Sequence, residues 1–193
     1  REEELKEELS SIQNQGRMLE SIKNSLKSHD SLMPYSVILK SLPKRKVISL
    51  RKQVLDYYHE EELWKELENF SKKNNVKYAD NTYPMAIYHD TEYKEKNVDI
   101  EVQCTIKDNF KSVENEDFKF KTVQKILVAS VTFVGPYELM PYVTEAIAQW
   151  IEDNRFVISG PMFNIFHVSP AIEVDPSKYI TEACIQVKKE EDK

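Results

Sequence analysis

The chain contains an internal repeat, and this repeat limits the folds open to it more than any other feature. Residues 84–90 read PMAIYHD and residues 161–168 read PMFNIFHV, so Pro-Met and Ile-aromatic-His occur twice in the same order. The flanks repeat as well. Apolar residues of two predicted helices correspond at a spacing of 80 residues: Leu63 with Val143, Leu67 with Ile147, and Phe70 with Trp150. Such self-similarity indicates two copies of one structural unit.

Each copy has the pattern of a βαββ unit. In the first copy, the predicted elements are strands over 35–39 and 46–52, a helix over 60–73, and strands over 85–89 and 98–106. In the second copy, they are a strand over 123–134, a helix over 138–153, and strands over 162–168 and 179–187. We therefore expect an α+β fold with repeats at about 35–107 and 123–188, related by a pseudo-twofold axis. The sheet should be antiparallel with both helices on one face, leaving the other face free.

Composition narrows the class of protein. A chain of 193 residues with 40% apolar residues can bury one sizeable core. No apolar run approaches the roughly 20 residues of a membrane-spanning helix, and no signal peptide opens the chain. Cys104 and Cys184 lie in no disulfide framework or zinc-binding pattern. We expect a cytoplasmic protein with free thiols, no metal, no cofactor and no membrane partner.

The net charge also constrains the partner. The formal charge of −6 is the wrong sign for binding nucleic acid through phosphate contacts. An acidic domain suits a cationic ligand better, although the charge could equally serve solubility alone.

The first 30 residues have a different periodicity from the rest of the chain. Apolar residues recur every seven positions at Leu5, Ile12, Leu19 and Leu26. This narrow stripe predicts a dimerisation or linker helix over residues 1–30 that forms a coiled coil in a homodimer. The alternative is a helix packed on its own domain. The chain opens at Arg1 inside this pattern, so we expect it to be part of a longer protein, with a ligand-binding domain over 34–189 and a charged tail over 190–193.

Strand alternation identifies two candidate carboxylates. In the strand 98–106, Glu101 points away from the apolar helix-facing set, and Glu182 does so in the equivalent strand of the second copy. Glu182 lies between Ile180 and Cys184, and a carboxylate among apolar neighbours needs a compensating cation or hydrogen-bond donors. The simpler alternative is a solvated or hydrogen-bonded strand glutamate.

Aromatic residues are numerous around the expected trough between the two copies. A carboxylate beneath aromatic faces can bind an organic cation, although each of these rings could equally belong to the core. The predicted ligand-binding residues are Glu182, Cys184, Ile180, Glu101, Tyr57, Tyr58, Tyr88, Tyr137, Phe163 and Phe166. The equivalent histidines His89 and His167 are expected to have a structural role rather than to bind a metal.

Several motifs together resemble a known family. These are VISLRKQVLDYYHEEELWKEL, AIYHD, DIEVQCTI, GPYELM, SGP and YITEACIQV, which in this order are similar to the gyrase-inhibitor-like effector-binding domain. The helix ahead of them resembles the dimerisation linker of MerR-type multidrug-responsive regulators. The resemblance implies a trough that binds lipophilic, aromatic, often cationic compounds, with Glu182 at the family's acidic position. It also implies that DNA binding belongs to an N-terminal winged-helix domain outside this chain.

Two other functions compete with this one. Some members of the same domain family are hydrolases, and the resemblance implies Glu182 and Tyr137 as their general base and activator. The sequence has no independent catalytic motif such as GxSxG or HExxH. An acidic, aromatic trough could also accept a peptide or protein loop.

Overall fold

The computed structural model describes residue 16, residues 35–111, residue 113 and residues 115–190. Apart from Gly16 and Glu190, the predicted linker helix and the charged tail lie outside the described residues. The described elements are β1 (Ile38–Leu42), β2 (Arg45–Val54), η1 (Tyr57–His59), α2 (Glu60–Lys73), β3 (Met85–Tyr88), β4 (Val98–Thr105), β5 (Phe118–Val123), β6 (Ile126–Val134), η2 (Tyr137–Leu139), α3 (Met140–Asp153), β7 (Phe156–Val168), η3 (Pro176–Lys178) and β8 (Ile180–Lys189).

The strands form one antiparallel sheet, which confirms the predicted α+β class. Its order is β1-β6-β8-β7-β3-β4-β2-β5. Strands from the first half of the chain meet strands from the second half at the β3–β7 pair, where Met85 lies opposite Ile165 and Ala86 lies opposite Asn164. The backbone hydrogen bonds of this pair join the halves into a single sheet.

The two edge strands are exchanged between the halves. β1 directly precedes β2 in the chain but pairs with β6, whereas β5 directly precedes β6 but pairs with β2. β5 is a correction to the prediction, because residues 118–122 were not expected to form a strand. The predicted strand over 123–134 is divided in two, since the chain turns at Gln124 and Lys125 to start β6.

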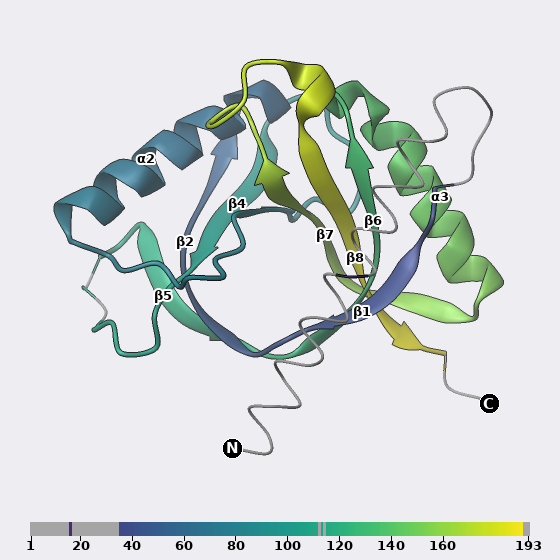
Figure 1. Ribbon diagram of the computed structural model, residues 1–193, viewed down its shortest axis with the longest axis horizontal. Helices are drawn as coiled ribbons and strands as arrows, with labels where there is room; N and C mark the ends of the chain where they lie inside the picture. Colours follow the sequence, from purple (N-terminus) through teal and green to yellow (C-terminus); the bar gives the residue numbers. More distant parts are fainter. Residues whose placement is uncertain (1–15, 17–34, 112, 114, 191–193) are drawn as a thin grey trace.

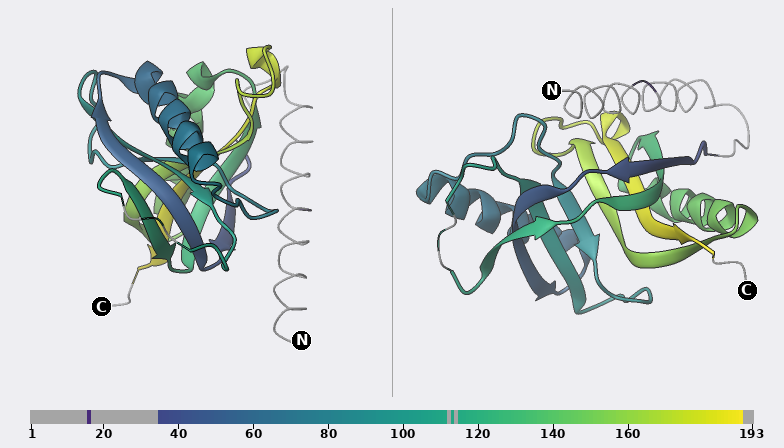
Figure 2. Two further views of the ribbon diagram at one scale, coloured as in Figure 1. Left: turned by 90° about the vertical axis from the view of Figure 1, so that its left-hand side faces the viewer. Right: turned by 90° about the horizontal axis from the view of Figure 1, so that it is seen from below.

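Both helices pack on the same face of the sheet (Figure 2). Leu63 and Leu67 of α2 are buried against β2 and β4, and Val143, Ile147 and Ile151 of α3 are buried against β6 and β8. These residues are four apart, so they form one apolar stripe per helix. Three acidic residues open α2 and two lysines close it, which suits the helix dipole.

The face opposite the helices is not free, contrary to the sequence-based expectation. The strands arch around the centre of the molecule with α2 and α3 on the outside of the arch (Figure 1). Met85, Val128, Phe163, Ile165 and Cys184 fill the inside of the arch as a third apolar cluster and are all buried. We call this the inner face, and the face that carries α2 and α3 the helix face.

A buried ion pair crosses the inner face at Glu182. Its side chain is 1% exposed, Lys40 Nζ of β1 lies 2.5 Å from its Oε1, and His167 Nε2 lies 3.3 Å from its Oε2. Burial by itself would raise the pKa of this carboxyl. The hydrogen bond to His167 and the charge of Lys40 outweigh burial and lower the pKa of Glu182 to about 2.

Glu101 has an equivalent set of partners. Lys121 of β5 forms an ion pair with its carboxylate, and His89 Nε2 lies 3.0 Å from Oε2. Here too the hydrogen bonds from His89 and Lys121 overcome the effect of burial, and the pKa of Glu101 falls to about 2. Each glutamate therefore binds one histidine and one lysine, and each lysine comes from an exchanged edge strand. His89 and His167 thus contact glutamates in the part of the chain that the structure describes.

We predict that Lys40→Met destabilises the protein by about 3 to 5 kcal/mol, because it leaves the buried Glu182 carboxylate without its cation. Urea unfolding of wild type and variant measures this loss. Lys121→Met is the matched control, and its effect should be smaller because Lys121 is 44% exposed and Lys40 only 9%. Adding Glu182→Gln to Lys40→Met should restore much of the lost stability. Equal losses in the two single variants would contradict the prediction.

The same carboxylates predict a pH dependence. Because their folded-state pKa values lie near 2 and below the ordinary value of 4.5, they stabilise the protein above pH 4.5. This stabilisation is lost as the pH falls from about 4.5 to about 2. The free energy of unfolding, measured by urea titration across this range, should fall more steeply in wild type than in Glu182→Gln. Parallel pH profiles would show that Glu182 makes no such contribution.

Candidate functional site

The sheet separates the ten predicted ligand-binding residues into two groups. Glu101, Phe163, Glu182 and Cys184 are buried on the inner face, and Ile180 shares this face by strand alternation. Tyr57, Tyr88, Tyr137 and Phe166 lie on the helix face. Tyr58 is 90% exposed and makes no aromatic pair among the described residues. The predicted acidic residues and the predicted aromatic residues therefore do not share one trough.

The inner-face group is largely buried, and its carboxylates have counter-ions from the same chain. Glu101 and Glu182 each have a lysine of the same chain as counter-ion. Cys184 is fully buried, and burial raises the pKa of its thiol well above the ordinary value. A ligand cation at Glu182 would have to displace Lys40 or share the carboxylate with it.

The helix-face rings form two groups, which hydrogen bonds to Glu60 link through Tyr88 and Trp64. Tyr57 packs edge-on against Tyr88 with ring centroids 5.8 Å apart, and Phe166 packs edge-on against both Trp64 at 6.0 Å and Tyr137 at 5.9 Å. Tyr179 extends the cluster, 5.4 Å from Tyr137. We call these six residues the aromatic cluster. They come from both halves of the chain and surround the starts of α2 and α3.

Short 3-10 turns position the two tyrosines that precede the helices. Asp56 caps η1 by accepting a hydrogen bond of 2.9 Å from the Tyr58 backbone N–H, which holds Tyr57 at the start of α2. Tyr137 follows Gly135-Pro136 at the start of η2. Gly135 has a φ of 131°, a conformation that side chains rarely tolerate, and a Cβ there would lie 2.8 Å from Leu139. The chain thus needs glycine at the turn that presents Tyr137.

A carboxylate lies within the aromatic cluster. Glu60, the first residue of α2, accepts a hydrogen bond of 2.9 Å from the Trp64 indole N–H and another of 2.9 Å from the Tyr88 hydroxyl. Among the described residues, no lysine, arginine or histidine forms an ion pair with it. Burial raises the pKa of Glu60 despite these two hydrogen bonds. Its environment is therefore the opposite of that of Glu182.

Sequence reasoning missed Glu60. It opens the run Glu60-Glu61-Glu62, which is typical of a solvated first turn of a helix. One local signal was present, because Glu60 and Trp64 are four residues apart and share a helix face. The contact with Tyr88 could not be read from the sequence, since it depends on how α2 packs against β3.

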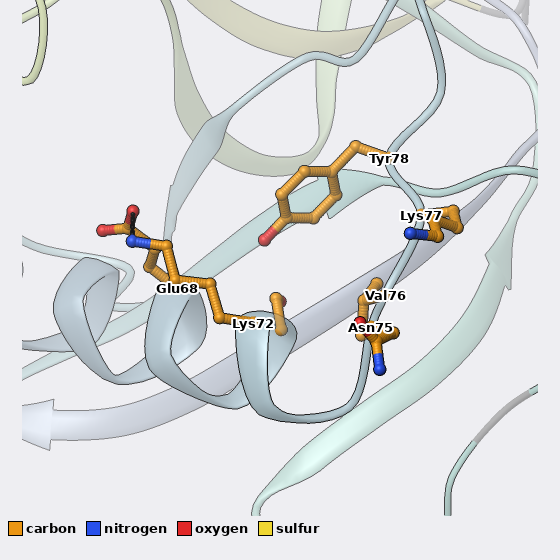
Figure 3. Close-up of a pocket in the computed structure, with 7 residues that line it drawn as sticks. Glu68, Lys72, Asn75, Val76, Lys77 and Tyr78 are labelled. Carbon is orange, nitrogen blue, oxygen red and sulfur yellow. Dashed lines mark ion pairs between the residues drawn. The ribbon is translucent and has the colours of Figure 1, made fainter.

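A separate pocket lies at the other end of α2 (Figure 3). It has a volume of about 320 Å³ and is lined by Glu68, Ser71, Lys72, Asn75, Val76, Lys77 and Tyr78. Lys72 is paired with Glu68 at 2.6 Å, so these two charges compensate each other. None of the predicted ligand-binding residues lines it.

Over 35–111, 113 and 115–190, no group of three or more His, Cys, Asp or Glu side chains is arranged to hold a metal ion. Neither α2, α3 nor any other helix of this part of the chain is long and apolar enough to cross a membrane.

Solved structures share this fold. The crystal structure of the C-terminal domain of EcmrR, a MerR-family regulator, has a TM-score of 0.74 at 27% identity, covering 82% of this chain and 100% of that one. The cryo-EM structure of EcmrR with DNA has a TM-score of 0.75 at 24% identity, covering 98% of this chain and 69% of that one.

More distant structures show the fold alone. A hydrolase from Listeria innocua has a TM-score of 0.57 at 11% identity, covering 86% of this chain and 97% of that one. SAV2435 bound to tetraphenylphosphonium has a TM-score of 0.50 at 12% identity, covering 79% of this chain and 94% of that one.

No protein with a curated function matches this sequence. The model of the GyrI-like small molecule binding domain matches residues 35–188, which is most of the chain. The chain therefore belongs to the GyrI-like small-molecule-binding family.

Proposed function

We propose that this chain is the effector-binding part of a bacterial transcriptional regulator, and that it binds lipophilic aromatic cations at the aromatic cluster. The observation that carries the proposal is the Glu60 carboxylate, which lies among aromatic rings without a cation from the described part of its own chain. A negative charge in such a place is costly, and a cationic ligand would offset that cost.

The cluster offers a planar cation two kinds of contact. The rings of Tyr57, Tyr137 and Phe166 can attract the positive charge, at about 0.5 to 2 kcal/mol per cation–π contact. Tyr93 already stacks on one face of Tyr57, with ring centroids 5.8 Å apart. Glu60 supplies the counter-charge at the N-terminal end of α2. Since Tyr137 is 37% exposed and Tyr57 and Phe166 are half-buried, a ligand could reach these rings from solvent.

This proposal assigns the acidic role to Glu60 rather than to Glu182 or Glu101. The two inner-face glutamates already have lysine and histidine partners. Of the residues predicted from the sequence, it retains Tyr57, Tyr88, Tyr137 and Phe166 as ligand contacts. It assigns the inner-face residues to the stability of the fold.

The regulatory mechanism we infer is linkage between ligand binding and dimer geometry. The two halves would act as repeated units around a pseudo-twofold axis, with the ligand between them. The helix over 1–30 would join two copies and pass a change in geometry to winged-helix DNA-binding domains in the cytoplasm. A ligand that binds one geometry better shifts the population towards it. EcmrR supports this role, because its C-terminal domain has this fold and the protein binds DNA.

The ligand class has one further support. SAV2435, which shares the fold, binds tetraphenylphosphonium, a lipophilic aromatic cation. Because SAV2435 is only 12% identical to this chain, the proposed ligand class depends mainly on Glu60 and the aromatic rings around it.

Hydrolysis is the second candidate function, and a specific contact favours testing it. Glu60 and Tyr88 form a carboxylate–hydroxyl pair at 2.9 Å on the helix face, where a general base and an activating group could act together. The pair predicted from the sequence, Glu182 with Tyr137, is separated by the sheet. Turnover of a bound compound, followed by its product, would distinguish this function from simple binding.

We predict that Glu60→Gln weakens the binding of rhodamine 6G by about tenfold or more, because it removes the counter-charge and keeps the side-chain shape. Quenching of tyrosine and tryptophan fluorescence measures the affinity. The variant should be at least as stable as wild type at neutral pH, since a half-buried charge without a cationic partner among the described residues is removed.

Two controls make this test specific. Glu62→Gln removes an exposed carboxylate from the same helical turn and should bind as wild type does. Glu182→Gln should also retain binding. Loss of binding in Glu182→Gln but not in Glu60→Gln would return the acidic role to Glu182, and failure of wild type to bind would refute the proposed function.

The dimer has a separate test. Sedimentation of the whole chain should give twice the monomer mass, and a chain starting at Met33 should sediment as a monomer. Equal oligomeric states in the two would refute dimerisation through residues 1–32.

A further inference from the structure

Asn164 occupies the centre of the helix face, where the two halves of the sheet meet. It lies on β7 opposite Ala86 of β3 and opposite Ala183 of β8. Both neighbours have methyl side chains, so the Asn164 amide stands between small residues on the floor of the aromatic cluster. Its side chain is 4% exposed, so its polar atoms are almost fully removed from water.

The hydrogen bonds around Asn164 determine which way its amide points. The Tyr88 hydroxyl has a single proton, and it donates this proton to Glu60 Oε2. Tyr88 can therefore only accept a hydrogen bond from Asn164, which turns the amide nitrogen towards it at 3.1 Å. The carbonyl oxygen Oδ1 points elsewhere and has no partner among the described residues.

A buried acceptor without a partner is costly, and a ligand that supplies a donor would recover that cost. The two residues that carry these acceptors, Asn164 and Glu60, thus both form hydrogen bonds with the Tyr88 hydroxyl. A cation with an N–H group can donate a hydrogen bond to the Asn164 carbonyl and also offset the charge of Glu60. A quaternary onium ion carries the same charge but has no proton to donate.

We propose that Asn164 makes this site selective for aromatic cations that carry an N–H group, such as protonated amines, over quaternary ammonium or phosphonium ions. This inference rests on the proposed function, since it names the ligand class of the same site. It goes beyond that function by assigning specificity to a residue that contributes no charge. Asn164 is a specificity-determining residue whose carbonyl accepts the ligand's N–H.

The test compares two ligands that differ by one methyl group. Protonated (2-naphthylmethyl)dimethylamine has one N–H, and (2-naphthylmethyl)trimethylammonium has none. Calorimetry at pH 7 should show that wild type binds the first about tenfold more tightly, as expected for one hydrogen bond to a buried acceptor. Asn164→Leu should bind the two with nearly equal affinity while keeping its affinity for the quaternary ion.

A matched variant controls for the loss of any buried polar group. Ser130→Ala removes a buried hydroxyl on the inner face, on the opposite side of the sheet from Asn164, so it should keep the tenfold preference. If Asn164→Leu does not fold, Asn164→Ala replaces it, because the alanine side chain has no hydrogen-bond acceptor.

The outcomes separate the two proposals. A preference in wild type that Asn164→Leu loses and Ser130→Ala keeps supports the role of Asn164. Equal binding of both cations by wild type, or an unchanged preference in Asn164→Leu, overturns this role and leaves the proposed function standing. Failure of wild type to bind either cation overturns both.

Discussion

The pairing of β3 with β7 is the contact on which the position of every candidate site residue depends. It joins the two halves of the chain into one sheet and places Ala86 opposite Asn164. Because α2 and α3 both pack on the same face of that sheet, their N-terminal ends approach this central pair from opposite sides. Residues that begin different helices, such as Tyr57 and Tyr137, thus become parts of one aromatic cluster. Without the pair, each half would carry an incomplete set of rings.

The carboxylates on the two faces of the sheet have opposite environments. On the inner face, Glu182 and Glu101 have lysine and histidine partners that hold their pKa values near 2, so these charges stabilise the fold. On the helix face, burial raises the pKa of Glu60, and hydrogen bonds from Tyr88 and Trp64 compensate it only in part. Carboxylates with a shifted pKa and no counter-ion from their own protein are common at ligand-binding sites, because the bound ligand supplies the opposite charge.

Most of the secondary structure could be predicted because it depends on local periodicity. The helix predicted over 60–73 matches α2, and strand alternation placed Glu101 and Glu182 on the face away from the helices. Two expectations about the fold were wrong. Edge strand β5 was missed, although Phe118 and Phe120 alternate with lysines as in a strand. The supposedly free face is filled by its own side chains, because the sheet arches around them.

The sequence by itself determined which residues share a helix stripe or a strand face, because these relations follow from the 3.6-residue and two-residue periods of the backbone. It also determined the supply of aromatic residues and carboxylates. Only the tertiary structure decided which carboxylate received a cation. Lys40 reaches Glu182 because β1 pairs with β6 rather than with its neighbour β2, and Tyr88 reaches Asn164 from 76 residues away. Strand order and helix packing are set by the burial of the whole core, and no local pattern encodes them.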